Sequence, residues 1–206
     1  MSSYNLELFS QEMNMASICR HPNLMHFIGA TNEGIPLIVT ELMHTDLRKI
    51  IEQDELDSKQ IILISLGVAY GLNYLHKTTP DPILHRDVSS ANVFLNPIPI
   101  NQWHPKLSEF GSTNFLRASS TIGAGSPTYA APEALTVQGR HTPAMDVFSF
   151  GVVIYEMCSR KFPSEKPTHS SMNLVKWATT ETKLVSLIQK SLATEIERRP
   201  TIIRMD

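Results

Sequence analysis

The sequence has few cysteines, no long apolar segment and no leader-like start. Cys19 and Cys158 stand far apart and form no CxxC pair, which argues against a disulfide framework and against a zinc site. The longest apolar stretch, Ile61 to Leu75, is interrupted by polar residues and is shorter than the roughly 18 residues that a membrane span needs. The first residues carry charges and amides where a secretory signal would be apolar. These absences predict a cytoplasmic protein without a membrane span.

Charge and composition exclude further classes of partner and of protein. Eighteen Lys and Arg stand against 20 Asp and Glu, a net charge of -2, so nothing attracts the chain as a whole to nucleic acid or anionic lipid. Hydrophobic residues make up 42% of the 206 residues, with nine Gly and 13 Pro. This composition excludes disordered and collagen-like chains and predicts a folded core.

Hydrophobic periodicity predicts helices separated by short strands. The apolar runs around Asn32-Glu33-Gly34 predict an antiparallel hairpin, and Asp57-Ser58 predicts a helix cap. Strands and helices do not alternate regularly along the chain, so a doubly wound sheet is not predicted. The remaining expectations are helices over 8–18, 61–75, 146–158 and within 174–192, strands at 83–84, 93–95 and 106–107, and a mobile loop over 112–126.

Five short motifs follow one another in a fixed order. HRDVSSANVFL (85–95) places an Asp and an Asn five residues apart in a loop, a spacing that lets both side chains face one site. It is followed by EFG (109–111), GSPTYAAPE (125–133), DVFSFG (146–151) and ERRPT (197–201). The series resembles the eukaryotic protein kinase signature set. GSPTYAAPE is closer to the Ser/Thr pattern than to the tyrosine-kinase one, and Ser89-Ser90 resembles loops of the tyrosine-kinase-like group of mostly Ser/Thr kinases.

The resemblance implies an α+β, protein-kinase-like fold covering nearly the whole chain. Residues 1–43 would form a partial small lobe, with a helix, a β-hairpin and the hinge, and residues 44–206 the mostly helical large lobe. The first three strands of a kinase small lobe have no counterpart here, nor do its glycine-rich loop and VAIK-type Lys. The sequence therefore predicts either a fragment of a longer protein or a truncated product.

The resemblance also implies the residues of a phosphotransfer site. Asp87 would be the catalytic base, and Asn92 and Glu109 would supply oxygen ligands to Mg²⁺. Arg86 would hold a phosphorylated activation loop. The expected phosphorylation site in that loop is Ser119, Ser120 or Thr121.

A second group of residues would bind the ATP cofactor or brace the site. Thr40 would be the gatekeeper, Glu41 to Met43 the hinge whose backbone meets the adenine, and Phe94 an apolar surface beneath it. Glu12 would be the small-lobe helix Glu that pairs with the VAIK-type Lys. By the same resemblance, Asp146 would brace the catalytic-loop backbone and Arg199 would pair with Glu133.

Departures from the kinase pattern leave two functions open. Glu109 stands where kinases carry Asp, and its extra methylene moves the carboxylate by about 1 Å at a site that tolerates little misplacement. Ser89 and Ala91 stand where kinases usually carry a phosphate-facing Lys or Arg. One hypothesis is a Ser/Thr-type protein kinase that is inactive or weak as this chain. The alternative is a pseudokinase that binds protein partners without ATP turnover.

Overall fold

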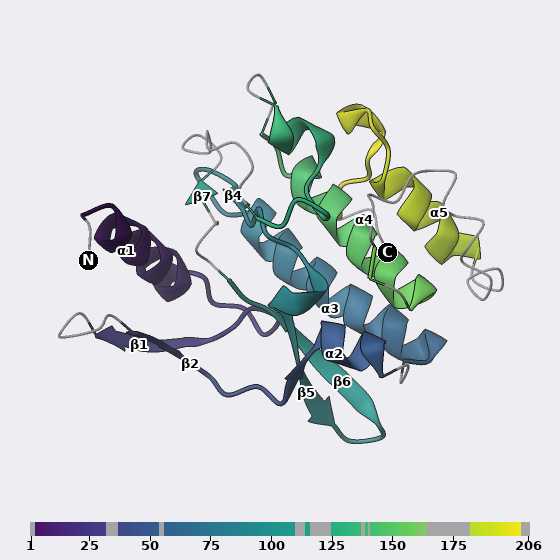
Figure 1. Ribbon diagram of the computed structural model, residues 1–206, viewed down its shortest axis with the longest axis horizontal. Coiled ribbons are helices and arrows are strands. Elements are labelled where there is room, and N and C mark those ends of the chain that lie inside the picture. The colour runs from purple at the N-terminus through teal and green to yellow at the C-terminus, as the bar shows by residue number, and fades with distance from the viewer. Residues whose placement is uncertain are drawn as a thin grey trace.

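Helices and short antiparallel strands make up the described chain (Figure 1). The structure is a computed structural model that describes residues 3–31, 37–53, 56–109, 114–115, 125–136, 139, 141–160, 162–163 and 182–202. The helices are α1 (Ser3–Ile18), α2 (Leu47–Glu52), α3 (Ser58–His76), α4 (Ala144–Ser159) and α5 (Thr182–Ser191). The strands are β1 (Phe27–Thr31), β2 (Leu37–Thr40), β3 (Thr45–Asp46), β4 (Ile83–Leu84), β5 (Val93–Ile98), β6 (Gln102–Leu107) and β7 (Asn114–Phe115). The 3-10 turns are η1 (Ser90–Asn92), η3 (Pro132–Leu135) and η6 (Ile196–Arg198).

Among the described residues, the strands form three separate antiparallel groups. β1 pairs with β2 as the predicted hairpin, although its turn lies outside the described residues. β3, β5 and β6 form a three-stranded sheet in that order, and β4 pairs with β7. The prediction made β5 and β6 too short, because Pro97 and Pro105 read as strand breakers. Pro105 is accommodated because β6 is an edge strand of its sheet.

Helix α3 begins at the predicted cap residue Asp57, which forms a capping box with Gln60. The Asp57 side chain accepts a hydrogen bond from the Gln60 backbone N–H, and the Gln60 side chain accepts one from the Asp57 N–H. A Cβ at Gly71 would lie only 2.9 Å from the Asn23 carbonyl oxygen. The glycine thus lets the segment that follows α1 pack directly on α3. Helix α1 ends at Ile18 as predicted but begins at Ser3, earlier than the predicted Leu8.

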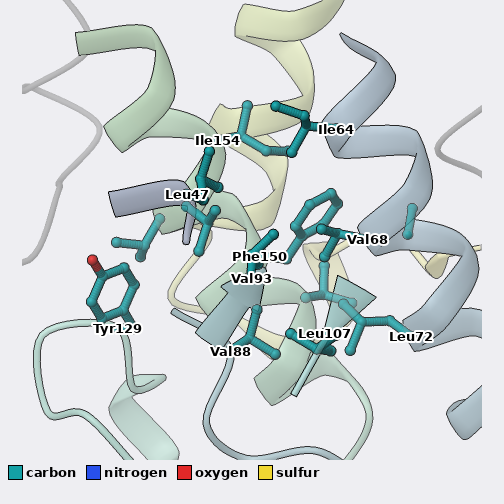
Figure 2. Packing of buried hydrophobic residues seen from close by; sticks show 14 of the residues in the cluster. Leu47, Ile64, Val68, Leu72, Val88, Val93, Leu107, Tyr129, Phe150 and Ile154 are labelled. Atoms are coloured by element: carbon teal, nitrogen blue, oxygen red, sulfur yellow. The ribbon is translucent and has the colours of Figure 1, made fainter. Parts of the chain in front are cut away.

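Helix α4 lies at the centre of the helical layer, between α3 and α5 (Figure 1). Every residue from Met145 to Cys158 is buried, because apolar residues lie on all sides of this helix and its two carboxylates, Asp146 and Glu156, are hydrogen bonded. Figure 2 shows the core cluster to which Val68 of α3, Leu107 of β6 and Phe150 of α4 all contribute. This core is the rigid support beneath the loop at 85–92.

Both cysteines belong to the hydrophobic core. Cys19 and Cys158 are free and buried, and burial raises the pKa of each thiol to about 12. They are packing residues of the core. Within the described part of the chain, no helix combines the length and the apolar character that crossing a bilayer requires. The predicted loop over 112–126 and the expected helix near 174–178 lie almost wholly outside the described residues.

Candidate functional site

The loop from His85 to Asn92 is anchored by a carboxylate of α4. Asp146 lies in the first turn of α4 and is almost fully buried. Its Oδ2 accepts a hydrogen bond from the His85 backbone N–H at 2.9 Å, and its Oδ1 accepts one from the Arg86 N–H at 2.8 Å. His76 Nε2 lies 2.8 Å from the same Oδ2. Asp146 therefore contacts the loop backbone in the way that the resemblance implies.

Asp87 and Asn92 lie together, as their spacing predicts. Asn92 Nδ2 donates to Asp87 Oδ2 at 3.0 Å and to the Asp87 carbonyl at 2.9 Å. Because the amide nitrogen donates its hydrogen bonds to Asp87, the amide oxygen of Asn92 is the atom that can bind a cation. The pair thus presents a carboxylate and an amide oxygen at one end of η1.

The other oxygen of Asp87 contacts the segment at 125–126. Asp87 Oδ1 accepts a hydrogen bond from the Ser126 backbone N–H at 2.9 Å. Gly125 has φ +86°, and a Cβ there would lie 2.2 Å from the Arg86 carbonyl oxygen. Only glycine fits this close approach. Both carboxylate oxygens of Asp87 therefore accept hydrogen bonds from the chain itself.

His85 connects Asp87 to the residues before Glu109. The buried imidazole places Nε2 2.9 Å from the Ser108 carbonyl, and Nδ1 lies 3.3 Å from the Asp87 backbone nitrogen. A carbonyl only accepts and a backbone N–H only donates, so Nε2 carries the proton and Nδ1 accepts. His85 is neutral in this arrangement. Burial lowers the pKa of His85, although the charges of Asp146 and Asp87 oppose the shift.

The neutral state of His85 predicts a loss of stability in acid. The folded-state pKa of His85 lies below the ordinary histidine pKa of about 6.5, so the unfolded chain binds more protons as the pH falls through that value. This contribution is present above that pH and is lost progressively below it. We expect the free energy of unfolding, measured in urea, to fall between about pH 7.5 and pH 5.5. An NMR titration of the His85 ring with a midpoint at or above 6.5 would contradict the assignment.

Glu109 occupies a strained backbone position beside the loop. Its φ is 71°, in the left-handed region where Asn, Asp and Gly are favoured and Glu is uncommon. Ser108 ties this segment to the loop, since its N–H donates to the Asn92 carbonyl at 2.9 Å. The Glu109 side chain is exposed. One backbone hydrogen bond thus joins Asn92 to Ser108, the residue that immediately precedes Glu109.

A cavity of about 290 Å³ lies between the β1–β2 hairpin and β5. Its lining includes all four residues predicted to bind the nucleotide other than Glu12, together with Glu109: Thr40, Glu41, Met43, Phe94 and Glu109. Apolar side chains from α1 and the hairpin complete much of the wall: Ala16, Met25, Phe27 and Ile38. Asp87, Asn92 and Arg86 lie outside this lining. The structure therefore separates the predicted residues into a cavity group and a loop group, joined through Ser108 and Glu109.

Some predicted residues fall outside what the structure describes. The Glu12 side chain and the candidate phosphorylation sites Ser119, Ser120 and Thr121 are among them. Arg86 is described, and its side chain is buried beside the loop. The predicted pair of Arg199 and Glu133 is present, with two hydrogen bonds between guanidinium and carboxylate.

The prediction missed a buried polar network beneath the loop. Glu156 accepts hydrogen bonds from Ser90 Oγ at 2.9 Å and from Tyr129 Oη at 2.6 Å. Arg48 donates to both hydroxyls at 3.2 Å. Burial raises the pKa of Glu156, and burial with the Glu156 charge raises that of Tyr129 to about 12. A lone carboxylate inside the apolar segment FGVVIYEMC was the signal in the sequence.

Comparison with known proteins shows the family of the chain. The protein kinase domain family matches residues 2–205. Serine/threonine-protein kinase PBS1 of Arabidopsis thaliana is 35% identical over 185 residues, covering 82% of this chain and 39% of that protein. Receptor-like serine/threonine-protein kinase NCRK of the same plant is 34% identical over 192 residues, covering 83% and 33%.

A relative from another organism is also named a serine/threonine-protein kinase. Probable serine/threonine-protein kinase drkA of Dictyostelium discoideum is 34% identical over 165 residues, covering 77% of this chain and 24% of that protein. The chain thus spans less than half the length of each of these relatives. Because the family match covers nearly every residue, this chain belongs to the protein kinase family and has its α+β, protein-kinase-like fold.

Proposed function

We propose that this chain binds ATP and Mg²⁺ as a protein Ser/Thr kinase domain and transfers phosphate to protein hydroxyls weakly or not at all. The observation that carries the proposal is the contact between Asp87 and Asn92, in a loop that Asp146 braces. Asn92 also contacts Ser108, which lines the cavity. Asp87 would accept the proton of the substrate hydroxyl. The kinase names of the relatives support the Ser/Thr class and a protein substrate.

The residues of the site fit both cofactors. The cavity offers apolar side chains such as Phe94 to the faces of a purine, and Glu41 and Met43 lie in its wall. Asn92 and Glu109 offer an amide oxygen and a carboxylate, the ligand types that Mg²⁺ prefers. When bound, Mg²⁺ supplies positive charge to the phosphates during transfer. The chain's own part is to bind the ring, hold the metal ligands and orient Asp87.

Three features support weak transfer. Glu109 has a longer side chain than Asp, on a left-handed backbone position that disfavours it. Among the described residues that line the cavity there is no Lys or Arg to neutralise phosphate charge. Ser89 and Ala91 supply no cation in the loop. The first feature affects the position of a metal ligand, and the other two remove positive charge; phosphoryl transfer depends on both positioning and charge.

A pseudokinase that binds protein partners is the second candidate. Both oxygens of Asp87 already accept hydrogen bonds, from Asn92 Nδ2 and the Ser126 N–H. In this arrangement a substrate hydroxyl must compete with Ser126 for Oδ1. On this candidate, the chain would bind partners through its large lobe without ATP turnover. A cytoplasmic location stays a prediction for either candidate.

Thermal unfolding with and without ATP and Mg²⁺ tests the proposal. Ligand that binds only the folded state raises the midpoint. We expect a magnesium-dependent rise that is reduced in Asn92→Ala and increased in Glu109→Asp, because aspartate restores the shorter carboxylate. We also expect phosphate transfer to a Ser-containing protein no higher than that of Asp87→Ala.

The outcomes separate the two candidates. No midpoint shift in a cooperatively folded sample would contradict nucleotide binding and favour the pseudokinase. Transfer clearly above the Asp87→Ala level would contradict the expected weakness and establish an active kinase. A rise that needs ATP but not Mg²⁺ would remove Asn92 and Glu109 from the metal site.

A further inference from the structure

Residues 41–44, called here the hinge segment, are tied at both ends to the β5–β6 hairpin. At the first end, Lys106 Nζ of β6 lies 2.7 Å from Glu41 Oε1. The ion pair is partly sheltered, with side-chain exposures of 14% for Lys106 and 25% for Glu41. It joins positions that are 65 residues apart in the sequence.

The second tie is made by Asn96 of β5. Asn96 Oδ1 accepts a hydrogen bond from the His44 backbone N–H at 2.9 Å, and its Nδ2 lies 3.3 Å from Met43 Sδ. One amide therefore engages two consecutive residues of the hinge segment. Leu42, between the ties, is 93% exposed, so packing against the core does not hold this part of the segment.

The ladder of β5 and β6 explains why these ties occur together. Phe94 lies directly opposite Lys106 in the antiparallel register, and opposite residues carry their side chains on the same face. Asn96, two residues from Phe94, shares that face because side chains alternate along a strand. The face that carries Phe94 in the cavity wall therefore also carries both ties to the hinge segment.

Glu41 is also tied to the start of β1. The same Oε1 that contacts Lys106 accepts the His26 backbone N–H at 2.7 Å, and the Glu41 N–H donates to the His26 carbonyl at 3.0 Å. Although burial alone would raise it, the pKa of Glu41 is lowered by its hydrogen bonds to Lys106 and His26. Glu41 is thus ionised at neutral pH and joins the small lobe to the β5–β6 hairpin.

We infer that Lys106 and Asn96 are positioning residues that hold the hinge segment in the geometry needed to recognise adenine. The inference rests on the proposed nucleotide site. One cavity wall contains Glu41 and Met43 and the other contains Phe94, and the two ties set the spacing between them. Backbone groups of the hinge can distinguish the adenine edge from other purines only when this spacing is kept.

Adenosine and inosine provide the test, since they differ in the hydrogen-bonding edge of the ring and carry neither phosphate nor metal. We expect the parent chain to prefer adenosine. Lys106→Met should weaken adenosine binding about five- to tenfold and leave inosine binding almost unchanged. Asn96→Leu should act in the same direction, and Lys106→Arg should restore much of the preference because it keeps the charge.

The ratio of the two affinities separates positioning from general destabilisation. A partly unfolded variant loses both affinities by the same factor, so its ratio does not change. Lys49→Met is the matched control: its ammonium also pairs with a carboxylate, Asp46, but its side chain is 68% exposed. This control should keep the parent ratio, and thermal unfolding should confirm that each variant is folded.

Two failures are distinguishable. If the parent binds neither nucleoside, the proposed function fails and the positioning role fails with it. If the parent prefers adenosine and both Lys106→Met and Asn96→Leu keep that preference while folded, the positioning role alone is overturned. Tighter adenosine binding by Lys106→Met would also overturn it, because the tie would then restrain the hinge segment away from the binding geometry.

Discussion

Replacement of Asp146 by alanine is expected to lower the free energy of unfolding by about 3 to 5 kcal/mol. The carboxylate is buried and contacts the His85 and Arg86 backbone N–H groups and His76 Nε2. Alanine leaves these donors buried without their acceptor, and each such group costs about 1 to 3 kcal/mol. Urea-induced unfolding followed by circular dichroism measures the change.

The same variant should also loosen the loop that carries Asp87. Hydrogen exchange at the His85 and Arg86 amides reports this directly, since both N–H groups donate to Asp146. Glu197→Ala, at an exposed site in η6, serves as the control and should change stability by less than about 0.5 kcal/mol. A loss below about 1 kcal/mol in Asp146→Ala would mean that the anchor is dispensable.

Glu133→Ala should cost about 3 to 5 kcal/mol by a different route. It leaves Arg199, whose side chain is 0% exposed, as a buried cation without its carboxylate. The remaining partners of the guanidinium are the carbonyls of Ala193, Ala144 and Thr194, which offer hydrogen bonds but no full negative charge. Urea-induced unfolding again provides the measurement.

The chain provides a matched control for this pair. Glu195 and Arg198 form an ion pair of the same residue types at 3.8 Å, but with side-chain exposures of 58% and 75%. Glu195→Ala should cost between about 0 and 1 kcal/mol, because exposed pairs are screened by water. The double variant Glu133→Leu with Arg199→Met should recover part of the loss. Equal losses for Glu133→Ala and Glu195→Ala would refute burial as the cause.

The sequence predicts the local and ordered features of this molecule well. The Asp57 cap is confirmed because a capping box is encoded within a few residues. The α4 helix is confirmed because its apolar residues are contiguous. The contact of Asp87 with Asn92 follows from a five-residue spacing in one loop. All these features depend on short-range information.

What the sequence could not provide depends on contacts between distant segments. The Lys106 to Glu41 pair joins residues 65 positions apart, and neither residue has neighbours that indicate the other. The strands β5 and β6 extend past their prolines because the antiparallel ladder and the sheet edge accommodate them. The contact of Ser126 with Asp87 depends on the left-handed backbone at Gly125, which composition does not reveal.

The complete burial of α4 also bears on how the chain is synthesised. α4 packs against α3, which is made before it, and against α5, which is made after it. At Gly151, α4 and α5 come so close that a Cβ on this glycine would lie 2.6 Å from the Ser191 Cβ. After α4 has left the ribosome and before α5 has followed, the side of α4 that packs on α5 has no cover. The rate of translation beyond α5 therefore sets how long the nascent chain is open to aggregation or to capture by chaperones.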